Sequence, residues 1–207
     1  MFVRPFADPD TPALYDVCLR TADAGGDATH LHREPSLPGH VWLGAYLALE
    51  PVLAWVVDDG SGRPVGYVVG ADDTLAFEES RERSWWPGLR ALYPETIDRS
   101  DTLATGTMTG ADEELIRTIH HPHPPVPEVV AEYPSHLHID LLPEAQGHGL
   151  GRVLIDTLGA ALVRRGSTGV YVGVAAVNTP ALGFYRRVGF VDLLVAPGVV
   201  WLGRRLA

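Results

Sequence analysis

A glycine-rich turn between an apolar run and an amphipathic segment is the feature that most constrains this chain. In the stretch LLPEAQGHGLGRVLI, residues 141–155, glycines alternate at Gly147, Gly149 and Gly151. Apolar residues recur at helical spacing from Leu150 onward, so the helix begins inside the glycine run. The first N–H groups of a helix have no partner within the helix, and glycines leave them uncovered. The turn therefore predicts a binding site for an anion such as a phosphate.

Other interpretations of the glycine run are weaker. A tight turn that only needs positive φ would be satisfied by one glycine, whereas this turn has three. A P-loop needs Gly-Lys-Ser/Thr, and the sequence contains no lysine. The dinucleotide motif G-x-G-x-x-G does not match, because the spacing here is G-x-G-x-G and the turn lies late in the chain. A different phosphate-bearing ligand is therefore indicated.

Hydrophobic periodicity predicts an α/β chain with a mixed sheet. The runs VLAWVV and VGYVVGA flank the turn residues DDGSGRP and form the clearest hairpin. Strands are expected at 2–6, 52–57, 65–71, 136–142, 170–176, 190–195 and 199–202. Helices are expected at 12–22, 41–50, 75–92, 112–120, 150–165 and 180–188. We interpret residues 1–207 as one domain in which residues 72–134 form a helical insertion.

Composition limits the class of protein. Hydrophobic residues make up 46% of the 207 residues, which is enough for a core. The longest apolar run, at residues 41–49, is far shorter than the ~20 residues of a membrane span, and the start MFVRPFADPD lacks the apolar run of a signal peptide. Cys18 is the single cysteine, so neither a disulfide framework nor a cysteine-based zinc site is expected. We expect a cytoplasmic protein without a membrane partner.

Charge is distributed unevenly along the chain. The net charge is −10, and residues 1–134 hold 22 acidic residues against 9 arginines, whereas residues 135–207 hold 4 against 7. This division indicates an anionic ligand on the basic part and a cationic ligand on the acidic part, although a merely solvated surface explains the acidic part equally well. Nucleic-acid binders usually have a basic footprint, so no nucleic-acid partner is expected.

Two segments, QGHGLG at residues 146–151 and VNTPALGFYRRVGF at residues 177–190, resemble motifs of the GCN5-related N-acetyltransferases, the GNAT superfamily. The hexapeptide QGHGLG, residues 146–151, is similar to the family's Q/R-x-x-G-x-G/A signature. The segment VNTPALGFYRRVGF, residues 177–190, resembles the family's N-x-x-A-x-x-x-Y-x-x-x-G-F element. Taken alone, the second segment is also explained as a capped helix with an aromatic residue on its buried face. Two motifs in the family's order, about 27 residues apart with a strand between them, favour the resemblance.

The resemblance implies a GNAT fold, with a mixed central sheet of about six to seven strands flanked by helices, and acetyl-CoA as the cofactor. In that family the glycine-turn amides hold the pyrophosphate, the preceding strand pairs with the pantetheine arm, and a tyrosine protonates the departing thiolate. The tyrosine here is Tyr185, which is otherwise explained as a structural residue on a helix face. The cofactor-binding residues implied are Leu141, Leu142, Gln146, Gly147, His148, Gly149, Leu150, Gly151, Arg152 and Asn178.

A narrower resemblance concerns the segment YPSHLHIDLLPE, residues 133–144, and the long insertion before it. Together with the two motifs, these features are similar to bacterial homologues of the acetyltransferase-like C-terminal domain of eukaryotic O-GlcNAcase. The eukaryotic domain is thought to have lost cofactor-binding features, whereas the whole glycine signature is present here. This difference favours a cofactor-binding protein.

A general base is harder to assign than the cofactor site. Asp140 is the best candidate, since a carboxylate in the apolar run IDLL would be partly buried and have a raised pKa. Along a strand, His136, His138 and Asp140 share one face, which is explained either by a proton relay or by a polar sheet face under the insertion. A base is not required if the acceptor amine has a low pKa or loses its proton to water.

Two other clusters have ordinary explanations. The run HHPHPP at 120–125 offers three histidines to a metal, but ligands packed so closely in a proline-rich loop rarely close a site, and we predict a loop and no metal. Trp42, Trp85 and Trp86 either line a substrate groove or belong to the core.

Two functions follow from these observations. The leading one is an acetyl-CoA-dependent N-acetyltransferase acting on an amine of unknown identity, for which the acidity of the insertion indicates a cationic acceptor. The alternative is a non-catalytic acyl-CoA-binding or protein-interaction domain on the same scaffold. Transfer of a larger acyl group is also open, because acyl selectivity depends on the shape of a pocket.

Overall fold

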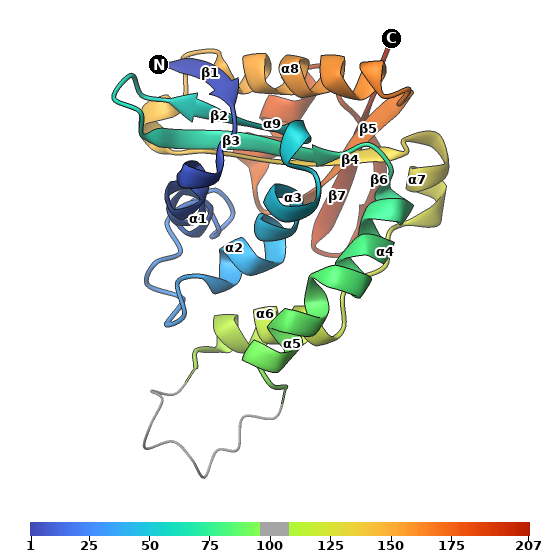
Figure 1. Ribbon diagram of the computed structural model, residues 1–207. Coiled ribbons are helices and arrows are strands. Elements are labelled where there is room, and N and C mark those ends of the chain that lie inside the picture. The colour runs from blue at the N-terminus through green and yellow to red at the C-terminus, as the bar shows by residue number, and fades with distance from the viewer. Residues whose placement is uncertain (96–107) are drawn as a thin grey trace.

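A seven-stranded mixed sheet forms the centre of the computed structural model, which describes residues 1–95 and 108–207 (Figure 1). The strand order is β1-β2-β3-β4-β5-β7-β6, and neighbouring strands are antiparallel except for β4 and β5. The strands are β1 (Phe2–Pro5), β2 (Ala54–Asp58), β3 (Pro64–Ala71), β4 (Ser135–Leu141), β5 (Gly169–Ala175), β6 (Val191–Ala196) and β7 (Val199–Arg205). The predicted mixed sheet of six to seven strands, with the 52–57/65–71 hairpin, is confirmed.

Helices cover both faces of this sheet. α8 packs on one face and α1 and α3 on the other, above and below the strands in Figure 1. α8 buries Leu154, Leu158 and Leu162 at helical spacing, which fixes its orientation on the sheet. The helices are α1 (Thr11–Leu19), α2 (Leu37–Trp42), α3 (Gly44–Leu49), α4 (Thr74–Ser84), α5 (Trp86–Leu92), α6 (Gly110–His120), α7 (Pro127–Glu132), α8 (Leu150–Arg164) and α9 (Thr179–Arg187).

Two helices expected from the sequence are each interrupted, so those expectations were wrong in part. The helix expected at 41–50 is α2 followed by α3, and the break lies at Leu43, where φ is −126° and ψ is −50°. The helix expected at 75–92 is α4 followed by α5, with the break at Trp85. Pro87 lies in the first turn of α5, where it lacks an N–H group and its ring prevents a continuous helix.

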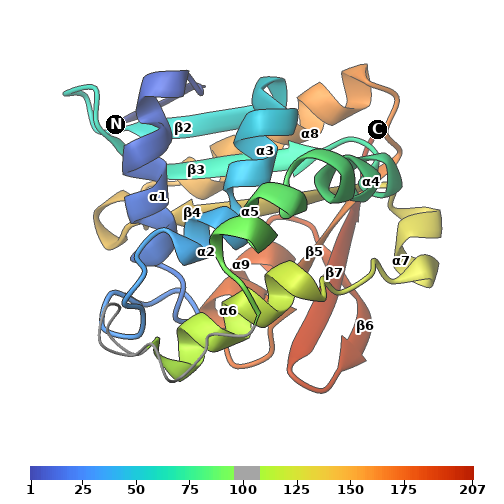
Figure 2. The same ribbon diagram turned by 60° about the horizontal axis from the view of Figure 1, so that its bottom comes forward.

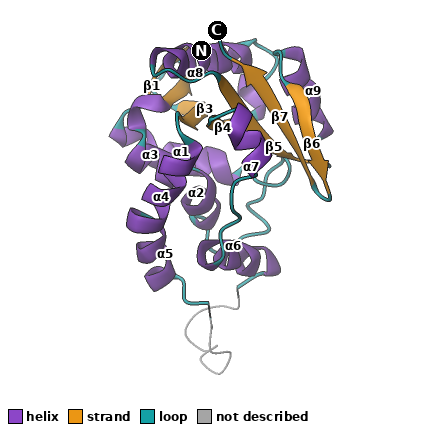
Figure 3. Cartoon of the chain, turned by 90° about the vertical axis from the view of Figure 1, so that its right-hand side faces the viewer, coloured by secondary structure: helices purple, strands orange, loops and turns teal. Residues whose placement is uncertain are grey.

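The predicted insertion forms a layer, α4 to α6, that projects away from the sheet, whereas its α7 packs on β5 (Figure 3). Its described part contains α4 to α7, and residues 96–107 of the predicted segment lie outside the described residues. α2, α5 and α6 bury a second hydrophobic cluster around Trp86 and Ile119. Trp42 and Trp85 pack against both this cluster and the main core, so the three tryptophans serve packing.

Smaller departures concern element ends and one helix. α1 ends at Leu19 rather than near residue 22. Just after this end, the Thr21 hydroxyl donates to the carbonyls of Val17 and Cys18. The sequence pattern did not indicate α7, because six residues are too few to show a period. Within residues 1–95 and 108–207, no helix is long and apolar enough to cross a membrane.

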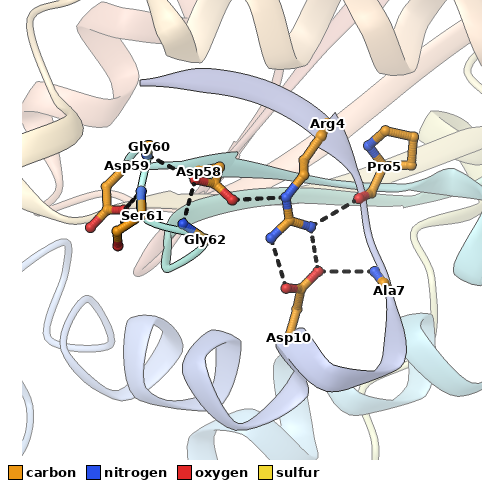
Figure 4. Close-up of polar contacts among 9 residues, drawn as sticks. All are labelled: Arg4, Pro5, Ala7, Asp10, Asp58, Asp59, Gly60, Ser61 and Gly62. Atoms are coloured by element: carbon orange, nitrogen blue, oxygen red, sulfur yellow. Dashed lines mark hydrogen bonds and ion pairs between the residues drawn. The ribbon is translucent and has the colours of Figure 1, made fainter.

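Arg4 on β1 joins the segment before α1 to the end of β2 (Figure 4). The Arg4 guanidinium donates to both carboxylate oxygens of Asp10, at 2.7 and 2.9 Å, and to Asp58 at 2.9 Å. Asp10 and Asp58 are 7% and 3% exposed. Asp58 also accepts hydrogen bonds from the N–H groups of Gly60 and Gly62 in the β2–β3 turn. These hydrogen bonds lower the pKa of both carboxyl groups below their ordinary value.

We expect Arg4→Met to destabilise the protein by about 2 kcal/mol, because two buried carboxylates lose their cation. The cost lies below that of a fully buried pair, since the Arg4 side chain is 25% exposed. Both aspartates have lowered pKa values, so this stabilisation is present at neutral pH and is lost as the pH falls through those values. Chemical denaturation at pH 7 and at about pH 2, well below the pKa of aspartate in an unfolded chain, measures it. Arg20→Ala is the control, because Arg20 pairs with an exposed Asp16, and an equal loss in both variants would contradict the assignment.

Candidate functional site

Six consecutive backbone N–H groups, immediately before α8 and in its first turn, make no hydrogen bond to the described residues of the chain. In the part of the chain that the structure describes, the N–H groups of Gly147 to Arg152 donate no hydrogen bond, and the first amide that does so is Val153, to the Gly149 carbonyl at 3.2 Å. The dipole of this 15-residue helix adds partial positive charge at the same end. The arrangement is suited to a phosphate group, as the sequence predicted.

The three glycines of the turn are required for different structural reasons. Gly147 and Gly149 have φ of +77° and +76°, a conformation that side chains rarely adopt, and a Cβ on either would meet nothing within 4 Å. Gly151 instead lies against the Phe184 ring, which a Cβ would approach to 3.0 Å. Positive φ alone therefore explains two of the three glycines. The open space beside them leaves the free amides accessible.

The other residues of the predicted cofactor site surround this turn. His148 is exposed, and Leu150 is half-buried at the first position of α8. The Gln146 side-chain amide donates to the Leu141 carbonyl at 2.9 Å, so it closes the turn against β4. Arg152 donates to the Arg187 carbonyl at 2.8 Å, which joins α8 to α9. The N–H of buried Leu142 donates to the Val65 carbonyl at 2.9 Å, so this amide is not free for a ligand.

β4 and β5 diverge immediately after they begin. Ser135 pairs with Val170 and His136 with Tyr171, and the pairing ends there. β4 stays paired with β3 as far as Leu141, and β5 with β7 as far as Ala175, so only their facing edges are open. We call this opening, between residues 137–141 and 172–175, the fork (Figures 1 and 2).

The fork is suited to an extended ligand. Backbone N–H and C=O groups inside a sheet need partners, and a ligand with its own amides can supply them as an added strand would. β4 ends at Leu141, and one short 3-10 helix, Pro143–Ala145, leads from it to the glycine turn, so the wide end of the fork lies towards the free amides of α8. One ligand with an anionic end and an amide-bearing arm can therefore bind both features.

Tyr185 lies on the buried face of α9 and is 4% exposed. Its ring packs between Phe184 and Phe190, at centroid distances of 5.3 and 5.2 Å. Its hydroxyl makes no hydrogen bond with the residues that the structure describes. Burial, followed by the negative charge of Asp140, raises the pKa of Tyr185 above its ordinary value, so the phenol is protonated at neutral pH. It is available as a proton donor.

Asn178 caps α9 rather than facing open space. Its side-chain oxygen accepts from the Ala181 N–H at 3.1 Å, and a Cβ on Gly25 would lie 3.4 Å from its side-chain nitrogen. The capping half of the second sequence motif is therefore confirmed. Its predicted contact with the cofactor stays a prediction.

Asp140 is the centre of a partly buried polar group that joins β3 and β4. Tyr67 on β3 lies directly opposite Asp140 on β4 and donates its hydroxyl to the carboxylate at 2.5 Å. The same carboxylate oxygen lies 2.9 Å from Nε2 of His138. Tyr67 is fully buried, whereas the side chains of His138 and Asp140 are 31% and 18% exposed. The sequence analysis missed Tyr67, and strand register was the signal that could have found it.

The predicted raised pKa of Asp140 is wrong. Burial alone would raise the pKa, but the charge of His138 and the hydrogen bonds from His138 and Tyr67 outweigh it and lower the pKa of Asp140 below its ordinary value. The sequence showed the apolar neighbours in IDLL but not the two donors, which come from the pairing with β3 and from the same face of β4. Asp140 is therefore a carboxylate at neutral pH.

His136 does not join Asp140 in a relay. It is buried among Tyr46, Phe77 and Tyr171, and its Nδ1 lies 2.8 Å from the Thr74 hydroxyl. Burial, followed by the positive charge of Arg81, lowers the pKa of His136 to about 3, so the ring is neutral at neutral pH. The sequence explains this strand face either by a proton relay or by a polar face under the insertion. His136 fits the second explanation, whereas His138 and Asp140 are hydrogen-bonded to each other.

Cys18 on α1 lies beside this pair. Its thiol and ligand atoms of His138 and Asp140 all lie within 4.8 Å of one another. These are donor types that zinc accepts, so the sequence argument against a cysteine-containing set was too general. At the present spacing the Asp140 oxygen is already hydrogen-bonded to His138 and Tyr67, and burial raises the pKa of the Cys18 thiol. We therefore interpret these residues as a hydrogen-bonding environment for the Asp140 carboxylate and not as a metal site.

The histidine run after α6 has mostly structural contacts. Nε2 of His120 lies 2.8 Å from the Tyr93 carbonyl, and Nε2 of His121 lies 2.7 Å from the Glu95 carboxylate. His123 is exposed and borders a pocket described below. The predicted loop is confirmed by the absence of regular structure between α6 and α7 within the described residues.

Comparison with known proteins agrees with this geometry. The family model described as the acetyltransferase (GNAT) family matches residues 27–190. The crystal structure of SsHAT is 41% identical, with a TM-score of 0.89, and the match covers 100% of this chain and 98% of that one.

Two more distant structures share the fold. YncA from Salmonella typhimurium, a putative acetyltransferase solved with acetyl-CoA, is 14% identical over 100% of this chain and 94% of that one, with a TM-score of 0.56. Naa20 from Chaetomium thermophilum, solved with a bisubstrate analogue, is 17% identical over 100% and 87%, with a TM-score of 0.54.

We expect Tyr67→Phe to raise the pKa of Asp140, because the variant keeps the ring and removes a hydrogen bond that stabilises the carboxylate. The measurement is an NMR titration of the Asp140 side-chain carboxyl carbon. Tyr15→Phe is the matched control, since it removes a partly buried hydroxyl that does not bond to Asp140. If Asp140 titrates at the same pH in the wild-type protein and in Tyr67→Phe, the hydrogen bond does not control its charge.

Proposed function

This chain belongs to the acetyltransferase (GNAT) family, and on that premise we propose that it transfers an acetyl group from acetyl-CoA to an amine. The single observation that carries the proposal is the row of six N–H groups, Gly147 to Arg152, which have no partner among the described residues and lie at the open end of the fork. Acetyl-CoA is the cofactor of this family, and its chemistry matches both features. The pyrophosphate is an anion for the amides, and the pantetheine arm carries amides for the fork.

Each predicted cofactor residue then has a proposed task. The amides of Gly147 to Arg152 bind the pyrophosphate, and exposed Arg152 adds positive charge beside it. Gln146 holds the turn against Leu141, whose strand edge faces the arm. Leu142 supports this edge through Val65 rather than through a contact with the ligand. Asn178 positions the first turn of α9 and thereby Tyr185.

The proposed chemistry needs a neutral amine and a protonated leaving group. When bound, acetyl-CoA supplies a thioester carbonyl, which a neutral amine can attack. A C–N bond forms and the C–S bond breaks, and the amine loses a proton while the sulfur gains one. Asp140 is an acceptor for the first proton, either directly or through His138 at 2.9 Å. Tyr185 donates the second, since its raised pKa keeps it protonated.

Three finer points are part of the proposal. Residues 1–207 act as one domain, which the packing of Trp42 and Trp85 against both hydrophobic clusters supports. The resemblance to bacterial homologues of the acetyltransferase-like domain of O-GlcNAcase stays a prediction that rests on residues 133–144. The alternative function is a non-catalytic acyl-CoA-binding or protein-interaction domain. It uses the same CoA site but gives Tyr185 no proton to transfer.

We expect Gly149→Glu to weaken CoA binding at least tenfold, about 1.4 kcal/mol, because it places a side chain and a negative charge among the free amides. Calorimetric titration with CoA and acetyl-CoA measures the effect. The matched control is Gly166→Glu at the other end of α8, where φ is +89° and a Cβ also meets nothing within 4 Å. Equal weakening in both variants would point to backbone strain and against a phosphate site.

We expect Tyr185→Phe to lower kcat by roughly 10–1000-fold while the Kd for CoA hardly changes, because the variant removes only a proton donor. A panel of amines with acetyl-CoA, followed by release of free thiol, gives kcat and KM. Tyr133→Phe is the control, since Tyr133 is a buried tyrosine that packs under Arg205. Tight CoA binding with no turnover of any amine by the wild-type protein would favour the non-catalytic alternative.

A further inference from the structure

A pocket of about 210 Å³ lies beside the closed end of the fork. Its walls come from the sheet and from the insertion layer, and the segment between α6 and α7 forms its rim, crossing β7 in Figure 2. The lining residues are Tyr46, Glu78, His123, Pro124, Pro125, Val126, His136, Tyr171 and Trp201. None of the functions assigned above uses this pocket.

The pocket lies on the same sheet face as the proposed base. His136 and Tyr171, the last paired residues before the strands diverge, both line it. Along β4, His138 and Asp140 follow His136 at two-residue steps, which keeps their side chains on the face of His136. A row of side chains on one face of β4 therefore begins at the pocket with His136 and continues through His138 to Asp140.

On β5, beside this row, the residues after Tyr171 have no large side chain on the same face of the sheet. Gly173 and Ala175 follow Tyr171 on the same face, and both are exposed although β5 lies inside the sheet. Trp201 lies opposite Gly173 on β7, with its indole nitrogen 3.4 Å from where a Cβ of Gly173 would be. The small residues leave an uncovered path from the aromatic pocket towards the pair.

The chemistry of the pocket suits an ammonium group. Its lining includes the aromatic rings of Tyr46, Tyr171 and Trp201, and aromatic rings attract cations. Glu78 is the single carboxylate among the lining residues, and no arginine lines the pocket within the described part of the chain. Arg81 on the same helix binds Oε1 of Glu78 at 2.7 Å and leaves the other oxygen without a protein partner among the described residues. His136 adds no positive charge, since its pKa is lowered.

We propose that this pocket binds a cationic alkylammonium group of the acceptor, while a second amine of the same molecule reaches His138 and Asp140 and is acetylated. The inference rests on the proposed acetyl transfer. His138 and Asp140 lie two and four residues along β4 from His136, which is roughly 7 and 13 Å. The acceptor is therefore a flexible α,ω-diamine with nitrogens about that far apart, either free or as a lysine side chain beside another cation in a peptide.

The test compares acceptors and variants. Initial rates with acetyl-CoA are measured for straight-chain diamines of increasing length and for monoamines of matched length. We expect wild-type kcat/KM to be at least about tenfold higher for the best diamine, and Glu78→Gln to remove most of that preference through KM. Glu79→Gln is the matched control, because Glu79 is one residue away and its side chain is 77% exposed. Equal rates for diamines and monoamines, or equal loss in both variants, overturn the proposal.

A second variant and a binding measurement keep the test independent of folding and of turnover. Trp201→Leu removes an aromatic wall without a change of charge and should also raise KM for diamines. Calorimetry with a diamine in the presence of CoA should show binding that Glu78→Gln weakens, and CoA binding itself should be unchanged. Binding of this kind without turnover would keep the pocket and refute acetyl transfer, whereas turnover without any dependence on Glu78 would do the reverse.

A third arm distinguishes the two sources of the ammonium group. Peptides with a lysine beside a second lysine, and the same peptides with glutamine in place of the second, are compared with the free diamines. A free acceptor is indicated if diamines exceed both peptides in kcat/KM, and a peptide acceptor if the two-lysine peptide exceeds them. Acetylation of the two peptides at equal rates and of diamines no faster than monoamines would overturn the pocket assignment.

Discussion

The early divergence of β4 from β5 is the constraint on which the rest of the site depends. Parallel pairing lasts for two residue pairs, and the strands then keep only their outer partners, β3 and β7. An open edge inside a sheet is costly unless something else satisfies its backbone groups. The divergence also sets positions: the wide end of the fork meets the free amides of α8, and the closed end meets the aromatic pocket. In the proposed reaction, donor and acceptor approach one point from opposite ends.

Around that point the structure separates charged groups from neutral ones. Asp140 remains ionised because Tyr67 and His138 bind its carboxylate, and Tyr185 remains protonated because it is buried near that negative charge. His136, two residues from His138, is neutral among aromatic rings. A single strand face therefore carries a neutral histidine and a hydrogen-bonded carboxylate. The neighbours of each group set its charge: aromatic rings surround His136, whereas hydrogen-bond donors surround Asp140.

Much of this arrangement could be predicted from the sequence. The glycine turn and the VNTPALGFYRRVGF segment identified α8 and α9, because helix starts are governed by local backbone needs that leave a mark in residue choice. The expectations that failed depended on residues distant in sequence. The pKa of Asp140 depends on Tyr67, which strand pairing brings from 73 residues away. The breaks at Leu43 and Trp85 accompany the packing of two short helix pairs between the sheet and the insertion cluster.

By itself the sequence determined the family, the mixed sheet, the anion-binding helix start and the identity of a buried tyrosine on α9. Each of these is encoded by residues that are neighbours in the chain, through glycine conformation, capping and hydrophobic period. Only the tertiary structure decided the length of β4–β5 pairing, the charge of Asp140 and His136, and the pocket between sheet and insertion. These properties arise where segments far apart in sequence meet, since desolvation and hydrogen bonding act through space.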